Sequence, residues 1–204
     1  MFRIGFILLL FVAFTTTNSN AQESFKSGVY FGPNVGQIRG DGYAGFNKIG
    51  GQIGGFVSHN LKNDWDYIIS IGYINKGSFK PSKPDQGIFD KYLIILNYAE
   101  AKFTLRKQIS VVNLDVGPYL GILFTSSVAD ENDKLNNPTY NFRKIDFGGF
   151  IGISYPLNDK IIVSLTNEQS LWPMANSVEF VRWFGIVGGS FNNVLAVNFH
   201  YHFK

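Results

Sequence analysis

The chain has no cysteine among its 204 residues, and this absence excludes several classes of function. Without cysteine there are no disulfides, no thiolate metal ligands and no cysteine nucleophile. The charge balance is also slight, with 18 Lys and Arg against 15 Asp and Glu. A bias this small argues against nucleic acid as a partner.

Long apolar runs are missing as well, with one exception at the N-terminus. Residues 4–14 are largely apolar, and the small and polar residues after them end at Ala21. This run is shorter than the roughly 20 residues of a transmembrane helix, and Ser19 and Ala21 suit signal-peptidase cleavage. We therefore predict an exported protein with a cleaved signal peptide at residues 1–21 and one mature domain at residues 22–204. A retained membrane anchor is the alternative.

Alternation of apolar and polar residues is the strongest pattern that is present. At the C-terminus, small or polar residues separate Leu195, Val197, Phe199, Tyr201 and Phe203. Alternate residues of a strand face opposite sides, so this stretch predicts a strand with one apolar and one polar face. Because it ends on an aromatic residue almost at the terminus, we interpret it as the closing strand of an outer-membrane β-barrel.

Seven further segments show strand-like patterns. With the closing strand, the predicted strands are residues 27–37, 49–58, 65–77, 92–105, 112–124, 144–155, 161–170 and 193–204. The connections between them are alternately long and short, as in a barrel with short periplasmic turns and long outer loops. The sequence predicts an all-β fold, an eight-stranded antiparallel up-and-down transmembrane β-barrel in the Gram-negative outer membrane.

Aromatic residues gather near the predicted strand ends, where their rings suit the headgroup level on both sides of a membrane. Two prolines, Pro33 and Pro118, lie inside predicted strands. Proline cannot donate a hydrogen bond to a neighbouring strand, and a closed barrel has no edge to hold it. We therefore expect a β-bulge at each proline.

The polar faces of the predicted strands combine glycine, large rings and charge. An eight-stranded barrel is just wide enough for its inward side chains. The inward-facing charged residues are Lys76, Glu100, Lys102, Asp115, Asp146 and Glu168. Because an unpaired buried charge is costly, we expect a lumenal salt-bridge network among Glu100, Lys102, Asp115 and Asp146. Such a network indicates structural bracing rather than an ion path.

Motifs of known catalytic centres are lacking too. The chain has no Gly-x-Ser-x-Gly, no Walker loop and no His-Glu-x-x-His. Of its histidines, His59, His200 and His202, the last two share one face of the closing strand. Such a pair can bind a metal, with Glu100 or Asp115 as a further ligand, but the spacing identifies none. We predict no catalytic residue, no cofactor and no metal, and interpret the histidines as lumen-filling polar residues.

The last long connection, residues 171–190, is unusually apolar for a loop. Its large apolar side chains include Trp172, Met174, Phe180, Trp183 and Phe184. Exposed apolar surface marks contact with a partner or with the membrane. The loop, through Trp172, Phe180, Trp183 and Phe184, is therefore the candidate contact for an envelope protein. Alternatively, the flanking strands extend into it or it folds over the barrel mouth.

Several motifs resemble the PorT-like outer-membrane β-barrel family. They lie at residues 28–35, 47–56, 73–78, 117–121 and 146–149. In addition, Leu96-Asn97-Tyr98-Ala99-Glu100-Ala101 is similar to the family's Leu-x-Tyr-x-Glu-x motif, with Lys102 where a proline usually follows. The resemblance covers essentially the whole mature chain. It implies an eight-stranded barrel inserted by the outer-membrane assembly machinery, which would recognise the closing aromatic strand. Most members have no known activity, and one is associated with type IX secretion and gliding.

Together these patterns predict a non-enzymatic outer-membrane barrel with a structural or interaction role. A subunit of an envelope, type IX secretion or gliding assembly is the finer hypothesis, and membrane lipid is an expected partner. One alternative is an outer-membrane enzyme that modifies lipid, which needs a Ser/His/acid site at the lipid-facing rim. Another is a soluble calycin-like ligand-binding barrel, which needs an apolar lumen and a polar exterior.

Overall fold

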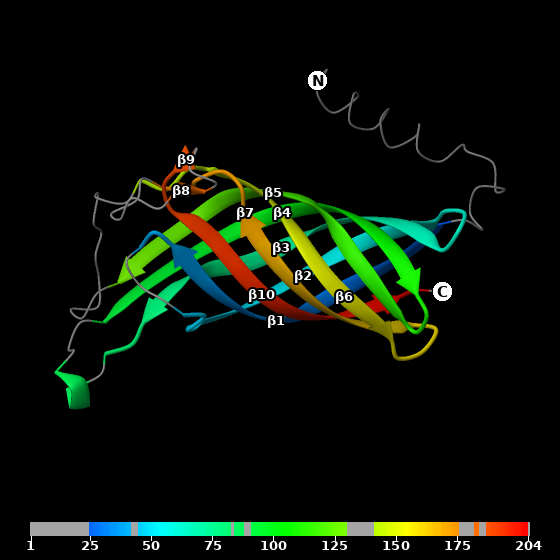
Figure 1. Ribbon diagram of the computed structural model, residues 1–204, viewed down its shortest axis with the longest axis horizontal. Coiled ribbons are helices and arrows are strands. Elements are labelled where there is room, and N and C mark those ends of the chain that lie inside the picture. Colours follow the sequence, from blue (N-terminus) through cyan, green and yellow to red (C-terminus); the bar gives the residue numbers. More distant parts are fainter. Residues whose placement is uncertain are drawn as a thin grey trace, which may run out of the picture.

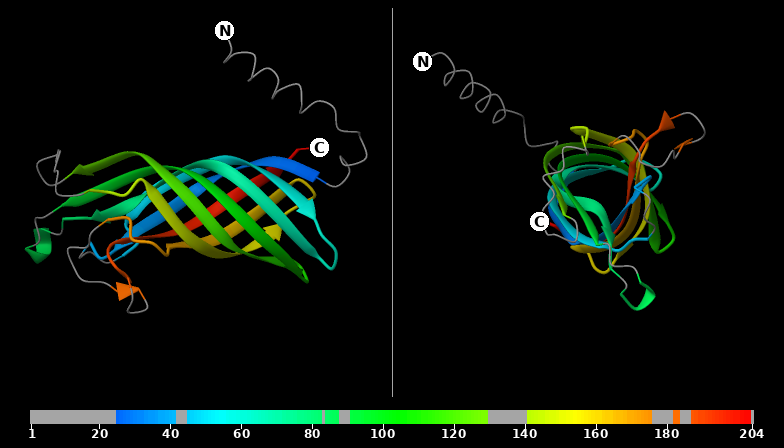
Figure 2. Two further views of the ribbon diagram at one scale, coloured as in Figure 1. Left: turned by 90° about the horizontal axis from the view of Figure 1, so that it is seen from above. Right: turned by 90° about the vertical axis from the view of Figure 1, so that its left-hand side faces the viewer.

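The computed structural model describes residues 25–41, 45–82, 84–87, 91–129, 141–175, 182–183 and 187–203. The predicted signal peptide at residues 1–21 lies outside these ranges. The long strands are β1 (Phe25–Arg39), β2 (Lys48–Asn60), β3 (Trp65–Lys80), β4 (Tyr92–Ile109), β5 (Val112–Ala129), β6 (Ile145–Pro156), β7 (Ile161–Ser170) and β10 (Phe191–His202). Each pairs antiparallel with its neighbours, and β10 closes the ring on β1. The view along the axis in Figure 2 shows the closed ring, which confirms the predicted eight-stranded barrel.

The two ends of the barrel differ in their connections (Figure 1). The end with the short connections at residues 61–64, 110–111 and 157–160 also holds the start of β1 and the end of β10. We name it the turn end, and in outer-membrane barrels this end faces the periplasm. The opposite end, with the long connections, is named the loop end.

Local chemistry explains the tightness of the turns. Asn63, Asp64 and Ser110 have positive φ values of 62°, 60° and 58°, a region that Asn and Asp tolerate best. In the β6–β7 turn, the Asn158 side-chain oxygen accepts hydrogen bonds from two backbone N–H groups at 2.9 Å. These turns set the register of each hairpin, and hence which residues face the lumen.

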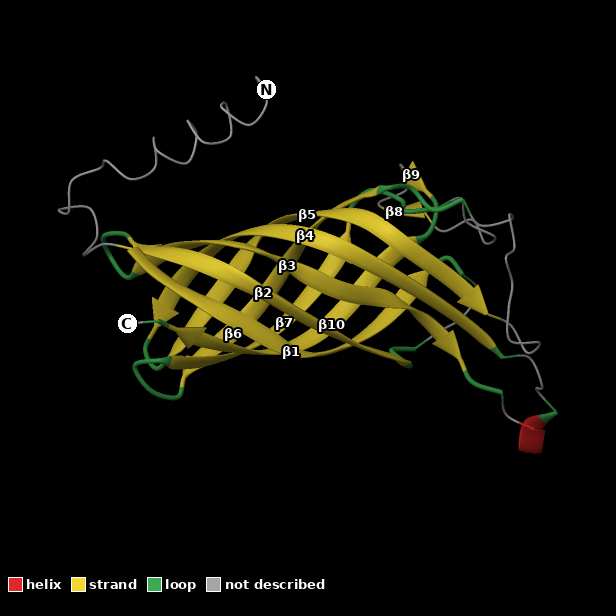
Figure 3. Cartoon of the chain, turned by 180° about the vertical axis from the view of Figure 1, so that it is seen from behind, coloured by secondary structure: helices red, strands yellow, loops and turns green. Residues whose placement is uncertain are grey.

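Small elements occupy the long connections at the loop end. They are the 3-10 helix η1 (Pro84–Gln86) and the strands β8 (Arg182–Trp183) and β9 (Val187–Gly188), which pair as a short hairpin. Figure 3 shows η1 beyond the strands that form the wall. No helix in the described ranges is long and apolar enough to cross a membrane.

The outer surface of the barrel is an apolar belt. Outward side chains along the strands are largely exposed, for example Ile49 at 79% and Ile71 at 66%, while their neighbours in sequence face the lumen. This arrangement suits contact with lipid. It is the reverse of the polar exterior that a soluble ligand-binding barrel needs.

The two prolines sit in the wall without bulges. Pairing keeps one register on both sides of Pro33 against β10, and on both sides of Pro118 against β4. The expected bulges at these prolines are therefore wrong. In the described ladders the register shift lies elsewhere, between Asn97 and Tyr98 of β4.

A glycine before each proline explains this accommodation. A Cβ on Gly32 would collide with the Val197 carbonyl oxygen of β10, and one on Gly117 with the Phe103 carbonyl oxygen of β4. Each carbonyl belongs to the residue facing the proline, which has no N–H to offer it. Because glycine has no side chain, the opposite backbone closes against it and the register continues.

Candidate functional site in the barrel lumen

The centre of the lumen holds a cluster of buried charges around Lys76. Its Nζ lies 2.5 Å from Glu100 Oε2, 3.3 Å from Asp146 Oδ2 and 3.6 Å from Glu168 Oε2. A second cation, Lys102, pairs with Glu100 at 3.2 Å and also with Glu168. The side chains come from β3, β4, β6 and β7, so the cluster joins strands across the barrel. We name these five residues the ion cluster.

The three carboxylates of the ion cluster outnumber its two cations, and neutral donors stabilise one of them, that of Asp146. Asp146 accepts hydrogen bonds from Ser170 Oγ at 2.6 Å and Asn192 Nδ2 at 3.0 Å. The Tyr119 hydroxyl lies 3.5 Å from Asp146 Oδ1, the oxygen that also accepts from Ser170, and the Tyr119 ring centroid lies 4.0 Å from Lys76 Nζ. A buried carboxylate needs such donors because water no longer solvates it. The polar residues around the ion cluster therefore contribute to its stability.

Two features of the ion cluster differ from expectation. The structure brings Lys76, Glu100, Lys102, Asp146 and Glu168 together, but the placement of Asp115 in the same network is wrong. Asp115 instead accepts two hydrogen bonds from Arg106, at 2.7 Å from Nε and 2.8 Å from Nη2. Arg106 was missed because the predicted strand ended one residue before it, whereas β4 continues to Ile109. Extending the alternation would have placed Arg106 inside.

The loop-end half of the lumen is filled by apolar side chains. This apolar plug consists of Ile38, Ile74, Tyr92, Ile94, Leu96, Tyr98, Val128, Met174, Ala175, Val194 and Ala196. Met174 comes from the loop after β7 and is 0% exposed, with its N–H bonded to Ser190 O at 2.8 Å. Met174 is therefore not part of an exposed apolar surface, and this part of the loop follows the alternative in which the loop folds over the barrel mouth. Part of this loop bends back into the barrel mouth.

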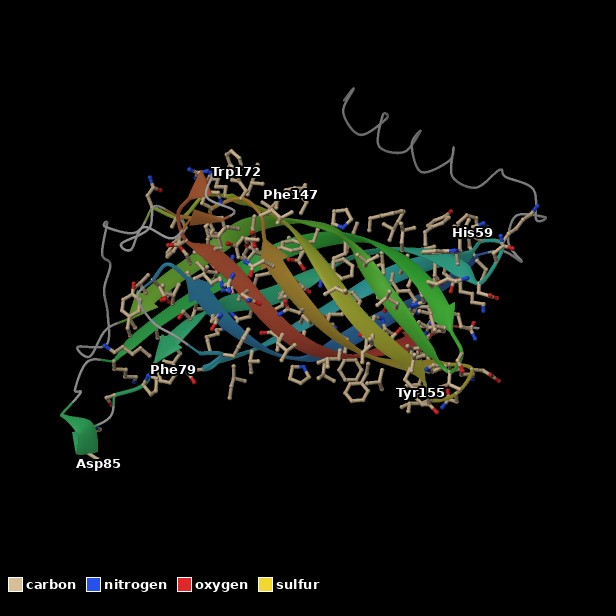
Figure 4. All side chains as sticks on the ribbon, in the orientation of Figure 1. His59, Phe79, Asp85, Phe147, Tyr155 and Trp172 are labelled. Carbon is tan, nitrogen blue, oxygen red and sulfur yellow. The ribbon has the colours of Figure 1, made fainter. Side chains whose placement is uncertain are left out.

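The other residues of the candidate partner loop are only partly described. Trp172 is 53% exposed at the loop end (Figure 4). Phe180 and Phe184 lie outside the described residues, as does the side chain of Trp183. The partner-contact expectation for this loop stays a prediction.

The turn-end half of the lumen is more open. Below the ion cluster lies a cavity of about 40 Å³, lined in part by Tyr30, Phe56, Arg106, Asp115 and His200. Beyond it the mouth widens into a recess of about 550 Å³. Its polar lining includes Lys26, Asn60, Asp66, Arg106, Asp159 and His202. We name this recess the vestibule, and polar space of this size holds water.

The histidines lie toward the turn end. His200 Nε2 is 3.0 Å from Ser164 Oγ, and the His200 ring stacks on Tyr30 at 5.8 Å between centroids. His202 packs edge-on against Phe56 at 4.9 Å. Within the described residues, no three His, Asp or Glu side chains gather in a metal-binding group. The Ser164–His200 pair faces the lumen rather than lipid, and no described hydrogen bond joins the other ring nitrogen to a carboxylate.

A closed barrel with an apolar exterior and a lumen that holds buried ion pairs defines an outer-membrane β-barrel protein. Sequence comparison agrees, because the family described as "Outer membrane protein beta-barrel domain" matches residues 20–176. This match covers more than half of the chain, and the chain belongs to that family. The protein is accordingly placed in the outer membrane.

The chain is also similar to several solved structures. Ail of Yersinia pestis, in complex with the heparin analogue sucrose octasulfate, is 12% identical, with 88% of this chain and 99% of Ail covered and a TM-score of 0.48. Neisserial surface protein A is 12% identical, with 88% and 97% covered and a TM-score of 0.49. OprG of Pseudomonas aeruginosa is 12% identical, with 88% and 94% covered and a TM-score of 0.39. Comparison with curated proteins gives no match. With TM-scores below 0.5, these similarities carry no argument about this chain.

Proposed function

We propose that this protein is a closed, non-enzymatic barrel that acts as a membrane scaffold and binds an envelope partner at its loop end. The observation that carries this proposal is the filling of the lumen at the level of Lys76. There Lys76 and Asp146 are 0% exposed, Glu168 1%, and Glu100 and Tyr119 2%. A passage for ions or solutes would have to break several buried ion pairs, which argues for a role at the ends of the barrel.

The finer proposal is that the partner belongs to an envelope assembly, such as a type IX secretion or gliding complex. The motifs shared with the PorT-like family support this idea. The apolar composition of residues 171–190 supports it as well, together with Trp172, which is 53% exposed, because exposed apolar surface usually marks a contact. In this proposal the ion cluster and the apolar plug keep the barrel rigid beneath the loop.

Crosslinking and co-purification from the envelope test the partner contact. The variant Phe180→Ser/Trp183→Ser/Phe184→Ser removes large apolar groups from the loop and leaves Trp172 in place. We expect the wild-type chain to retain a defined envelope protein and the variant to lose it. A matched control is Leu157→Ser, which removes an apolar side chain that is 56% exposed at the turn end. Heat-modifiable gel migration checks that each barrel is folded.

Three results would refute this proposal. If the partner stays bound to the triple variant, the loop is not the contact. If the wild-type barrel conducts ions stepwise in planar bilayers, the lumen is not closed. A generic anchor without partners would give no specific co-purification from wild-type envelopes.

A lipid-modifying enzyme is the second candidate, because Ser164 and His200 lie in hydrogen-bond contact at 3.0 Å. Serine next to histidine is the usual pairing of an acyl-transfer nucleophile and its base. The pair, however, borders a cavity of about 40 Å³, too small for a lipid headgroup with its chains. We expect no release of fatty acid from phospholipid vesicles. Release that disappears in Ser164→Ala and His200→Ala would favour the enzyme instead.

A further inference from the structure

A groove on the outside of the barrel lies at the loop end, between the start of β6 and the segment after β7. It is about 440 Å³ in volume and is lined by Arg143, Lys144, Ile145, Phe147 and Trp172. Figure 4 shows Phe147 and Trp172 on the same flank of the barrel. The groove thus joins two basic side chains at the rim to apolar side chains on the lipid-facing wall. We name it the rim groove.

The backbone holds both walls of the rim groove in place. The Arg143 N–H donates to Met174 O at 2.7 Å, and Lys144 O accepts from the Leu123 N–H at 2.7 Å. The Trp172 N–H lies 3.3 Å from Phe147 O on β6. Neither wall is a free loop, so a ligand would meet a preformed surface and lose little entropy in ordering it.

The two cations of the rim groove have no acidic partner in the described part of the chain. Arg143 lies over the Trp172 ring, with Cζ 5.7 Å from the ring centroid. On β5, β6 and β7 the described acidic residues are Asp115, Asp146 and Glu168, and all three are buried in the lumen. Among the described residues, the outer surface around the groove is therefore positive at its top and apolar below.

The turn end provides a direct comparison. There Lys107 lies over the Trp65 ring, with Nζ 5.5 Å from the centroid. This cation is balanced, because Asp64 Oδ2 lies 3.7 Å from Lys107 Nζ and the Asn63 carbonyl accepts a hydrogen bond from it. Both rims thus pair a cation with tryptophan, but only the loop-end pair lacks a nearby carboxylate among the described residues.

We propose that the rim groove binds one membrane lipid with a phosphorylated headgroup. Arg143 and Lys144 would hold the phosphate, since guanidinium donates to phosphate in a bidentate fashion and lysine adds a point charge. Trp172 lies where indole rings favour the headgroup level. Ile145 and Phe147, 57% and 45% exposed, would pack against an acyl chain. A soluble anion lacks the chain and would leave these two side chains uncovered.

Three probes separate the parts of this site in native mass spectrometry of the detergent-purified barrel. Phosphatidic acid carries the phosphate and two chains, diacylglycerol carries the chains alone, and glycerol phosphate carries the phosphate alone. We expect one phosphatidic acid to be retained by the wild-type barrel, and neither diacylglycerol nor glycerol phosphate to displace it at equal concentration.

Variants assign the retention to the rim groove. Each basic residue near an anionic surface contributes about 1 kcal/mol to binding, so its loss weakens the affinity about fivefold. The double variant Arg143→Gln/Lys144→Gln should therefore bind phosphatidic acid roughly 30-fold more weakly than the wild type. The matched control Lys107→Gln should bind as wild type does. Arg143→Lys keeps the charge and should recover most of the affinity.

Equal retention by the double variant and the wild type would overturn the proposal. So would full displacement by glycerol phosphate, which would show a site for a soluble anion, or equal binding of diacylglycerol, which would show an apolar groove alone. Heat-modifiable migration of each variant confirms that lost binding does not reflect a lost fold.

Discussion

The two halves of the lumen are built by the same strands and yet differ in kind. Toward the loop end, the ion cluster and the apolar plug fill the barrel, and Met174 and Leu96 are both 0% exposed. Toward the turn end, a cavity leads into a vestibule of about 550 Å³. The difference shows that an eight-stranded wall does not decide by itself whether its interior is open. The inward side chains and one returning loop decide it.

The charges of the two halves follow this difference. In the filled half, Lys76 contacts three carboxylates within 3.6 Å, because no water is available to solvate it. In the open half, Lys26, Asp66 and Asp159 line a wide mouth and face solvent. Arg106 and Asp115 lie at the boundary and form one bidentate pair. Lysine and acidic side chains thus form buried ion pairs on the loop-end side of this boundary, whereas on the turn-end side they are ordinary solvent-facing residues.

The largest expected effect comes from Lys76→Met, which removes the central cation of the filled half. Breaking a buried pair by removing one partner costs about 3–5 kcal/mol, because the remaining charges stay buried. Urea unfolding in lipid vesicles measures this loss. Lys26→Met at the vestibule is the matched control and should change stability by less than about 0.5 kcal/mol. Similar losses in both variants would contradict the contrast between the halves.

Met174→Ala tests the apolar plug. Truncation of a buried methionine costs about 2–5 kcal/mol, and we expect a value near the lower end because the loop can settle into part of the space. Met174→Leu keeps the volume and should cost less than about 1.5 kcal/mol. The same unfolding assay compares them. If the two variants are equally stable, Met174 does not anchor the plug.

Arg106→Gln tests the boundary between the halves. It leaves Asp115 without its partner, but water from the vestibule can reach the site, so we expect a loss of about 1–3 kcal/mol. The informative quantity is the loss of unfolding free energy in Arg106→Gln divided by the loss in Lys76→Met. A loss as large as that of Lys76→Met would mean that the boundary is as dry as the ion cluster.

Single introduced cysteines are expected to have the smallest effect on stability. They show most directly which part of the lumen is open to solvent. Asn60→Cys lines the vestibule and Ser78→Cys, 1% exposed in the wild-type chain, lies in the filled half. Because the chain has no cysteine of its own, a membrane-impermeant maleimide reports only the introduced thiol. Exposed thiols react and buried ones do not, so we expect Asn60→Cys to be labelled and Ser78→Cys to stay unlabelled. Labelling of both would show that the filled half is open to water from at least one end.

Much of the fold could be predicted from the sequence because alternation along a strand is local. The period of two is sufficient to place Glu100, Asp146 and Glu168 on the inner face, and the alternating lengths of the connections indicate which end carries the loops. The predicted strands differ from the observed ones mainly in their first and last residues. The predicted strand at residues 92–105 ends before Arg106, whereas β4 continues to Ile109. A strand can extend past its apolar pattern when its inward side chain is charged.

The partners inside the lumen could not be predicted in the same way. Lys76 and Asp146 are 70 residues apart in the chain, and their contact depends on how the strands stagger around the closed barrel. The Gly32-Pro33 pair illustrates the same limit, since the opposite backbone decides whether a proline needs a bulge. Met174 belongs to a segment without a strand pattern, so no periodicity could assign it to the core.

The sequence by itself therefore determined the class of fold, the membrane-facing surface and the set of inward residues, because these follow from the order of side chains along each strand. Tertiary structure alone decided which inward charges meet, which half of the lumen is filled, and where Arg143, Lys144 and Trp172 come together on the outer rim. Those outcomes depend on barrel closure and on a loop that returns to the wall, and both join residues that are distant in the chain.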